Sequence, residues 1–347
     1  MKFSVGYQLP DEYDCIADIV SDHREHISSV YFSPPGKNSA RTVIEDKYSP
    51  YMMEELRYIR DMGVGLTMLY NANCYGGRAV SSEFGKEIAA TVEQMLRQLD
   101  IGEITTTSPF VAQVVKKEFP QIKICASVNM WIGTTQAMEY LGDNFDGYYM
   151  QREYNRDLRK LKELSAWCNR HGKQLKMLAN SGCLYTCPFH MFHDNLVAHE
   201  AEACLLDNAM SSQPSPCWDL MYSKKAVDAA ATFLQESWIF PKDIHRYEPY
   251  VSEVKLATRM HYNPRRVVSA YVRGRFVGNM LDLTEPSYSR RFQEYILDAT
   301  KFPSDWFEKT TNCSKNCDAC GYCKEVAKQV MVSKRELEKL YLQGSTE

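Results

Sequence analysis

Two cysteines and two histidines lie within eleven positions of one another in the middle of the chain, a combination that suits metal binding. The four residues are Cys183, Cys187, His190 and His193, and they follow an apolar, strand-like run at 175–178. Thiolate and imidazole are ligands that select zinc, copper or iron–sulfur centres. Because packing alone seldom gathers these side chains on one loop, the segment predicts a metal or cluster site just after a strand.

Two more cysteines downstream enlarge this set. Cys204 lies in a segment that looks helical and suits either a ligand or a core position, whereas Cys217 lies in a proline-rich turn. A 4Fe–4S cluster takes four thiolates and accepts wide spacings between them. We therefore predict a cluster bound by Cys183, Cys187 and Cys217, with Cys204 or His193 as the fourth ligand. Zinc bound by Cys183, Cys187, His193 and Cys217 is the alternative.

A second group of cysteines stands near the C-terminal end, within eleven residues, and comprises Cys313, Cys317, Cys320 and Cys323. Structural zinc usually takes two separated Cys-x2-Cys pairs with a longer spacer between them. Tightly spaced thiolates on one loop are more typical of an iron–sulfur cluster. We predict a second 4Fe–4S cluster here, with electron transfer to the first site as its role and zinc as the alternative.

Short apolar runs alternate with longer amphipathic segments through most of the chain. The predicted strands are 3–6, 29–32, 65–70, 103–106, 122–128, 147–151, 175–178 and 251–256, and the predicted helices are 51–62, 82–98, 109–118, 134–141, 155–170 and 226–235. This alternation is typical of parallel strands joined by right-handed crossovers. A (β/α)8 barrel, an α/β fold of the TIM-barrel type, needs about 250 residues, which is the length available before Asn263. An open doubly wound sheet is the alternative, but no Gly-x-Gly-x-x-Gly turn follows the first strand.

The pattern changes near residue 270. We predict two domains, a barrel with its cysteine loop at 1–270 and a small helical, cysteine-rich extension at 271–347. Within the extension we expect helices at 287–299 and 324–342, with a loop at 301–306.

Polar residues follow several of the predicted strands, where the active site of a barrel lies. The candidates are Asn73, Asn129, Arg152, Glu153, Lys255 and Arg259. Arg152 and Glu153 are the candidate catalytic residues, with Glu153 as a proton carrier; an ordinary ion pair is the alternative. Lys255 and Arg259 suit a carboxylate or a phosphate, although a solvated charged face would have the same composition. Asn73 and Asn129 are expected to contact the substrate.

The bulk composition restricts the class of protein. At 347 residues with 44% hydrophobic and 24% charged residues, the chain is typical of a globular protein. A formal charge of −3 argues against a broad nucleic-acid surface. No apolar run reaches the length of a membrane span, and no signal peptide precedes the first strand. We therefore expect a cytoplasmic protein whose twelve cysteines are reduced thiols.

Five segments resemble the U32 peptidase family. They are Met150-Gln-Arg-Glu-Tyr, the segment from Asn180 to His190, Cys217, Trp238-Ile-Phe-Pro-Lys-Asp-Ile, and Lys255-Leu-Ala-Thr-Arg. The resemblance covers about residues 1–262 of the chain. The resemblance implies a barrel-like domain with a 4Fe–4S cluster bound by cysteines of this region. The better-understood branches of the family are similar to oxygen-independent hydroxylases that act on ubiquinone precursors or on tRNA and ribosomal RNA nucleobases.

The leading hypothesis is an iron–sulfur enzyme that performs redox or oxygen-independent hydroxyl-transfer chemistry on a small aromatic or anionic substrate. A redox partner or a U32 paralogue is the expected protein partner. A U32-type peptidase is one alternative, but the sequence has no Ser nucleophile elbow and no His-Glu-x-x-His motif. An RNA nucleobase-modifying enzyme is another, since the segments at 263–266 and 271–275 are rich in arginine.

Overall fold

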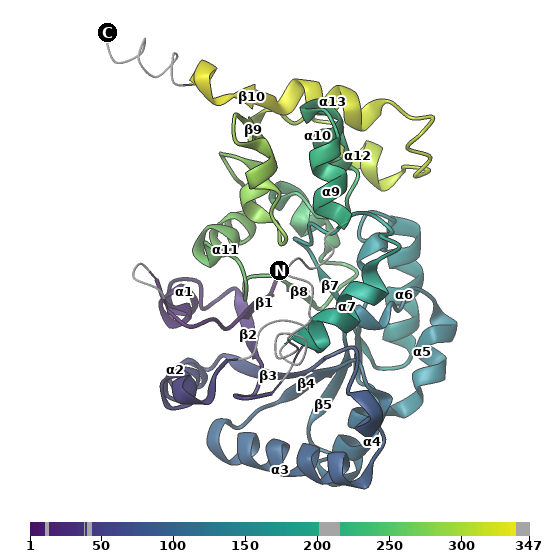
Figure 1. Ribbon diagram of the computed structural model, residues 1–347. Helices are drawn as coiled ribbons and strands as arrows, with labels where there is room; N and C mark the ends of the chain where they lie inside the picture. Colours follow the sequence, from purple (N-terminus) through teal and green to yellow (C-terminus); the bar gives the residue numbers. More distant parts are fainter. Residues whose placement is uncertain (11–13, 38, 40–43, 201–215, 338–347) are drawn as a thin grey trace, which may run out of the picture.

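The computed structural model describes residues 1–10, 14–37, 39, 44–200 and 216–337, and a closed barrel of parallel strands lies at its centre (Figure 1). The strands follow one another around the barrel in chain order. They are β1 (Phe3–Gly6), β2 (Ile27–Phe32), β3 (Gly65–Tyr70), β4 (Glu103–Thr106), β5 (Lys123–Ala126), β6 (Gly147–Tyr149), β7 (Gln174–Leu178) and β8 (Glu253–Lys255). The prediction of a (β/α)8 barrel is confirmed.

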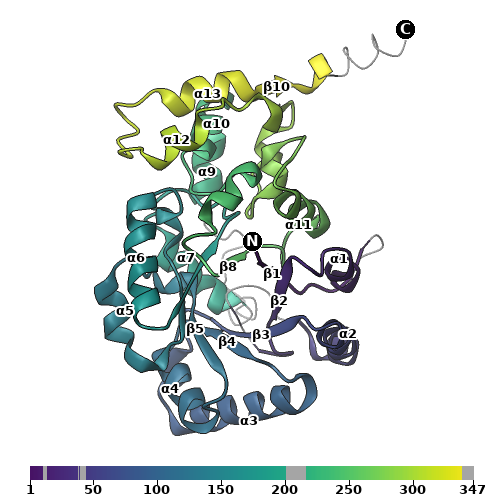
Figure 2. The same cartoon turned by 180° about the vertical axis from the view of Figure 1, so that it is seen from behind.

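Helices cover the outside of the barrel, as the views from the two sides show (Figures 1 and 2). They include α1 (Ile16–Asp22), α2 (Ser49–Asp61), α3 (Ser82–Leu99), α4 (Pro109–Glu118), α5 (Thr135–Leu141), α6 (Leu158–Arg170) and α11 (Pro264–Arg273). The amphipathic pattern explains the longest of them, α3, which buries Phe84, Ile88 and Val92 along one face. Its first turn is capped by the side chain of Ser81, which accepts a hydrogen bond from the Phe84 N–H.

The start of α6 corrects one sequence prediction. The helix begins at Leu158 and not at residue 155, because Asp157 caps it: the Asp157 carboxylate accepts the Lys160 N–H at 2.9 Å. Asn155 is buried instead, and its amide donates to the carbonyl oxygens of Leu178 at 2.7 Å and Ser237 at 3.1 Å. The side chain therefore fastens the end of β7, where the first cysteine loop begins, to the segment that leads toward β8.

The connection from β7 to β8 is long and carries the first cysteine loop. It contains α7 (His190–Ala198), α9 (Pro216–Ser223) and α10 (Ala226–Leu234). Of these helices, α10 packs against α13 (Tyr322–Val330) of the C-terminal segment. In the upper part of Figure 1, α9 and α10 lie beside the C-terminal elements. This packing attaches the segment that carries the second cysteine group to the connection between β7 and β8 of the barrel.

Of the two helices predicted in the C-terminal segment, the one at 287–299 was wrong, and the one at 324–342 was confirmed only in part, because α13 (Tyr322–Val330) forms its first part. Residues 295–297 form strand β9 (Tyr295–Leu297) and residues 331–333 form β10 (Met331–Ser333), and the two strands pair antiparallel. This pairing interrupts both predicted helices, at 287–299 and at 324–342, because long-range backbone hydrogen bonds prevail over local helix propensity. Only a short helix, α12 (Trp306–Thr311), lies between β9 and the cysteine group. The division of the chain near residue 270 stays a prediction, and α11 runs across that residue.

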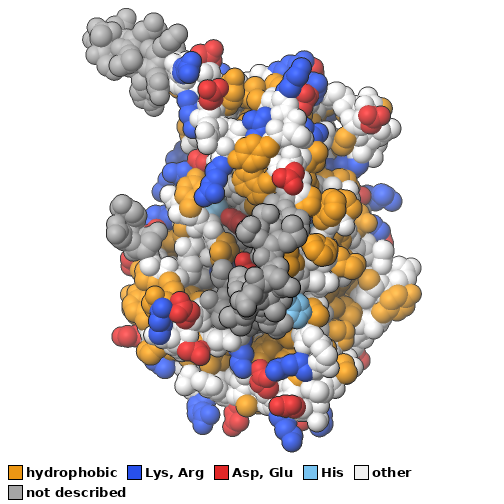
Figure 3. All heavy atoms as spheres, in the orientation of Figure 1, with side chains coloured by type: hydrophobic (Ala, Val, Ile, Leu, Met, Phe, Trp, Pro, Cys, Tyr) orange, Lys and Arg blue, Asp and Glu red, His pale blue; other side chains and the backbone are white. Residues whose placement is uncertain are grey.

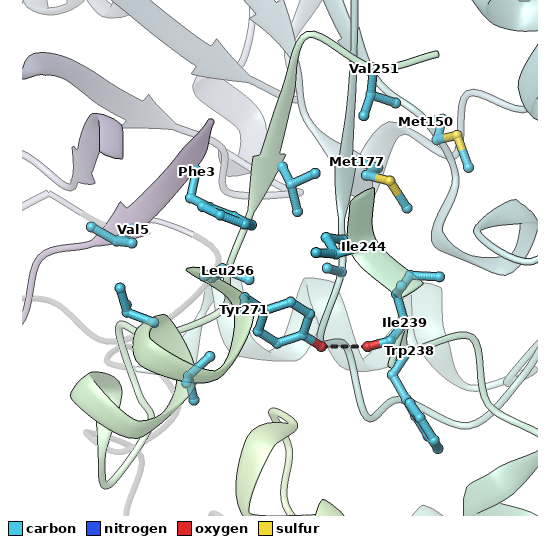
Figure 4. Close-up of a cluster of buried hydrophobic side chains, with 14 of the residues drawn as sticks. Phe3, Val5, Met150, Met177, Trp238, Ile239, Ile244, Val251, Leu256 and Tyr271 are labelled. Carbon is cyan, nitrogen blue, oxygen red and sulfur yellow. Dashed lines mark hydrogen bonds between the residues drawn. The ribbon is translucent and has the colours of Figure 1, made fainter. Parts of the chain in front are cut away.

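A buried hydrophobic cluster fixes the ends of β7 and β8 relative to the connecting segment (Figure 4). Phe3 of β1, Met177 of β7 and Leu256 after β8 pack with Ile239 and Tyr271, and all five are buried. The Tyr271 hydroxyl of α11 donates to the Ile239 carbonyl at 2.7 Å. Burial of each large apolar side chain stabilises the fold by about 1.5–3 kcal/mol, so the strand ends that carry the candidate site are firmly held.

None of the helices that the structure describes has the length and apolar character needed to span a membrane.

Candidate functional site

A cavity of about 80 Å³ lies at the carboxyl ends of the barrel strands. Among the residues that line it are Tyr31, Asn71, Asn129, Arg152, Ser181, Lys255, Arg259 and Glu285. Four of the residues predicted from the sequence, Asn129, Arg152, Lys255 and Arg259, thus meet in one place. We call this space the barrel-mouth cavity. Its three cationic side chains make it suited to an anion.

Lys255 lies among aromatic rings at the end of β8. Its Nζ is 3.8 Å from the centroid of the Tyr31 ring and 5.4 Å from that of Tyr149. The neighbouring carboxylate, Glu253, forms an ion pair with Lys176 at 3.1 Å. Burial, with a smaller effect of the nearby Arg259 charge, lowers the pKa of Lys255 to about 7. Keeping the Lys255 side chain protonated therefore costs free energy until an anion binds beside it.

Arg259, which also lines the cavity, is held in place by two serine side chains. Its Nη1 donates to the hydroxyl oxygens of Ser33 at 2.7 Å and Ser39 at 2.9 Å. Both serines are buried. A guanidinium held in this way is preorganised to bind a carboxylate or phosphate as a fork.

Arg152 connects the barrel mouth to the first cysteine loop. It is 6% exposed and follows β6. Its Nη1 donates to the Ser181 hydroxyl and to the Cys183 sulfur, both at 3.3 Å. Its Nη2 lies 2.6 Å from Nε2 of His190 and 3.4 Å from Oδ1 of Asn129. One side chain therefore contacts a candidate substrate residue and a candidate metal ligand.

The first cysteine loop surrounds a second cavity, of about 300 Å³, which we call the thiol cavity. Its lining includes Cys183, Cys187, His190, His193, Cys217, Met260, Glu285 and Tyr288. Cys183 and Cys187 come from the loop before α7, the two histidines from α7, and Cys217 from the first turn of α9. The structure thus brings together the predicted ligands that it describes. Cys204 lies outside the described residues.

The electrostatics of the thiol cavity favour a bound cationic centre. Burial raises the pKa of Cys187 and of Cys217, and a negative charge on Cys183 would raise both further. Deprotonated thiols are therefore costly here without positive charge beside them, which bound metal ions would supply. Among residues 1–10, 14–37, 39, 44–200 and 216–337, no three His, Cys, Asp or Glu side chains converge closely enough to hold a single ion.

Two predicted site residues lie outside the lining of the barrel-mouth cavity. Glu153 is 3% exposed, and it lines a separate cleft of about 320 Å³ together with Tyr185, Cys313 and Lys315. Asn73 supports the site indirectly, because its Oδ1 accepts a hydrogen bond from the Asn129 amide at 3.2 Å. The functional roles of both residues stay predictions.

Sequence reasoning missed the wall that the two cavities share. Glu285 and Met260 line both of them. Glu285 reaches the site because Ser181 and Glu285 form an isolated parallel bridge, with the Gly182 N–H donating to the Glu285 carbonyl at 2.9 Å. Gly182 allows this approach, since a Cβ at that position would collide with the Pro286 carbonyl oxygen. No spacing in the sequence signals a pairing between segments about a hundred residues apart.

The terminal cysteines line a further cavity, of about 290 Å³, which we call the outer cavity. Its lining includes Arg156, Lys315, Cys313, Cys317, Cys320 and Cys323. The Lys315 N–H donates to the Cys313 sulfur at 3.3 Å, with Lys315 in the left-handed backbone region at φ 62°. All four thiols are free, and Cys320 is exposed.

The face that carries α7 is rich in exposed hydrophobic side chains (Figure 3). Met191 and Phe192 of α7 are 69% and 60% exposed, and Met260, which borders both cavities, is 43% exposed. The outer edge of the thiol cavity is therefore apolar, whereas the barrel mouth is cationic.

Comparison with known proteins agrees with this architecture, although no family model matches the sequence. MJ1657 of Methanocaldococcus jannaschii, described as an uncharacterized protease, is 22% identical over 285 residues, which is 81% of each chain. The structure of the U32 peptidase Mk0906 superimposes with a TM-score of 0.53 at 16% identity, covering 74% of this chain and 92% of that one. The similarity of this solved structure shows that the two chains share the same fold. The motifs around Arg152, Cys183 and Lys255 resemble those of the U32 peptidase family, and both comparisons are consistent with that resemblance.

Proposed function

We propose that this protein is an iron–sulfur enzyme that carries out redox or oxygen-independent hydroxyl-transfer chemistry on a small anionic substrate, aromatic rings being favoured. Cys183, Cys187 and Cys217 would hold the cluster in the thiol cavity, with Cys204 or His193 as the fourth ligand. Once bound, the cluster would supply one-electron chemistry next to the substrate. The barrel-mouth cavity would bind the substrate.

One observation carries the proposal: Arg152 lines the barrel-mouth cavity and contacts a cysteine of the thiol cavity. Its guanidinium lines the barrel mouth and donates to the Cys183 sulfur at 3.3 Å. Hydrogen bonds and charge near a cluster sulfur tune the reduction potential of that cluster. An anion that binds beside Arg152 therefore changes the electrostatics of the thiol cavity, and a change of charge there alters how tightly the anion binds.

The remaining cavity residues have roles that follow from their chemistry. Lys255 and Arg259 bind and orient the anionic group, because both present cationic donors into the cavity. Tyr31 and Tyr149 give Lys255 an apolar surround that suits an aromatic ring and limits the access of water. Glu285 lines both cavities, so its carboxylate is better placed than that of Glu153 to hold or move a proton between them.

A peptidase would use the same thiols differently. A cysteine protease of the Cys–His type pairs its nucleophile with an imidazole that takes the proton of the thiol. Cys183 instead accepts a hydrogen bond from a guanidinium, which cannot act as a base. This contact suits a thiolate that binds a metal centre better than a thiol that attacks a peptide.

The proposal is tested by anaerobic purification of the full chain, followed by iron, sulfide and zinc analysis and absorption spectroscopy. We expect a brown protein in which Cys183→Ser, Cys187→Ser and Cys217→Ser each lose about four irons. Cys15→Ser is the matched control, because Cys15 caps α1 with its side chain and serine keeps that cap. A colourless protein with stoichiometric zinc, or peptidase activity that survives iron removal and is lost on thiol alkylation, would refute the proposal.

A further inference from the structure

We infer that the terminal cysteine loop binds a second inorganic centre, and that this outer centre passes electrons from an external one-electron donor to the thiol cavity. The inference rests on the proposed function, because it needs an electron acceptor in the thiol cavity. Three features of the outer cavity support it: an unpaired buried cation, direct contact between the two cysteine loops, and an exposed outer edge.

The first feature is Arg156, which lines the outer cavity and is 4% exposed. Its guanidinium donates to the carbonyl oxygens of Leu234 at 2.9 Å and Trp238 at 2.6 and 2.9 Å, and lies over the Trp238 and Trp306 rings. Within the part of the chain that the structure describes, Arg156 makes no ion pair with a carboxylate. A buried charge without a carboxylate in direct contact is costly.

Four thiolates around iron would supply a counter-charge. A cluster bound by Cys313, Cys317, Cys320 and Cys323 carries net negative charge, and Arg156 lines the same cavity. The Lys315 ammonium adds a second cation, while its backbone N–H already donates to the Cys313 sulfur. Backbone N–H groups directed at thiolates are a regular feature that tunes iron–sulfur sites. The outer cavity is thus electrostatically suited to an anionic cluster.

The second feature is the contact between the two cysteine loops. Tyr185 lies between Cys183 and Cys187 in the sequence, and the Lys315 Nζ is 5.0 Å from the centroid of its ring. Tyr185 and Cys313 also line a common cleft. Side chains of the first loop therefore contact side chains of the second loop directly, without an intervening element.

A buried carboxyl group lies near residues of both cavities. Glu236 is fully buried, and the charges of Cys183, Cys217 and Arg156 act on it. The contact between Tyr185 and Lys315 gives an electron that enters the outer centre a path through protein toward the thiol cavity.

The third feature is access from solvent. Cys320 is exposed, whereas the other three terminal cysteines are partly covered. An external donor can therefore approach the outer centre at this edge. In the transfer, the donor loses one electron and is oxidised, the outer centre is reduced and then reoxidised, and the electron ends in the thiol cavity.

The test uses the full chain purified anaerobically, with the double variant Cys320→Ser/Cys323→Ser compared with wild type and with Cys15→Ser. We expect about eight irons per chain in wild type and in the control, and about four in the double variant. Electron paramagnetic resonance of the dithionite-reduced wild type should show two interacting spins, and the double variant one isolated signal. Mössbauer spectroscopy of wild type counts the clusters without relying on any variant, in case the double variant does not fold.

The relay is measured by stopped-flow reduction with reduced methyl viologen. We expect the thiol-cavity signal to be reduced at least tenfold more slowly in the double variant than in wild type. The inference would be overturned if the double variant kept the iron content of wild type, or if it contained zinc in place of the iron it had lost. It would also be overturned if the thiol-cavity signal of the double variant were reduced at the wild-type rate. In each of these cases, iron that is still lost from Cys183→Ser and Cys217→Ser would leave the proposed function standing, so the two failures are distinguishable.

Discussion

Lys255 should make anion binding at the barrel mouth depend on pH in a way that can be calculated. Its pKa is lowered to about 7, so the ammonium is nearly fully charged at pH 6, half charged at pH 7 and charged in about a tenth of molecules at pH 8. If only the charged form binds an anion well, the apparent Kd rises by a factor of about 10 between pH 6 and pH 8. Binding is therefore strongest below pH 7 and weakens as the pH rises through it.

Sulfate is a suitable probe because it stays a dianion throughout this range, and isothermal titration calorimetry measures its Kd. Burial raises the pKa of Tyr31, of Tyr149 and of Cys125, so these neighbours stay neutral between pH 6 and pH 8. Lys255→Met should weaken binding at pH 6 by about 10–100-fold, the cost of one charge-assisted hydrogen bond. The variant should also lose the pH dependence.

The matched control is Lys242→Met, since Lys242 is an exposed lysine whose Nζ lies 4.9 Å from the centroid of the Phe240 ring. It should bind sulfate as wild type does. A wild-type Kd that does not change between pH 6 and pH 8, or an equal slope in Lys255→Met, would refute the role given to Lys255.

Further predictions concern the three charged residues that follow β6. Arg152→Met should lower the reduction potential of the thiol-cavity centre by about 50–150 mV, because a cation 3.3 Å from the Cys183 sulfur stabilises the reduced centre by roughly 1–3 kcal/mol. Potentiometric titration measures this shift, and an unchanged potential would contradict the prediction. Arg156→Met should lower the free energy of unfolding by about 2–4 kcal/mol in urea, since the Leu234 and Trp238 carbonyls lose their donors; wild-type stability would contradict that reasoning. Glu153→Gln should leave the Kd for sulfate within about twofold of wild type, because Glu153 lines the cleft that it shares with Cys313 and Lys315. A larger loss of affinity would show that Glu153 takes part in binding at the barrel mouth.

The barrel could be predicted because its signal is local. Each strand is a short apolar run, and each helix has an apolar face, so both follow from periodicities of two and 3.6 residues. Phe3–Gly6, Gly65–Tyr70 and Pro109–Glu118 begin and end where the sequence indicated. The cysteine loops could also be found, because cysteines at close spacing stand out in the sequence itself.

What could not be predicted depends on contacts between distant segments. The pairing of β9 with β10 replaced parts of two expected helices, and nothing in either segment alone signals it. Glu285 reaches the site through a β-bridge to Ser181. Asn155 was expected to begin a helix, but its side chain donates a hydrogen bond to the Leu178 carbonyl instead. Such residues are chosen by tertiary structure, which overrides local propensity.

The proposed function requires above all that the barrel-mouth and thiol cavities act as one site through Arg152. The most direct test records the electron paramagnetic resonance spectrum of the dithionite-reduced protein at pH 6, with and without saturating sulfate. We predict that sulfate shifts the g values of the thiol-cavity signal in wild type and leaves them unchanged in Arg152→Met. A wild-type spectrum that is indifferent to bound sulfate, or a reduced protein without any iron–sulfur signal, would contradict the account.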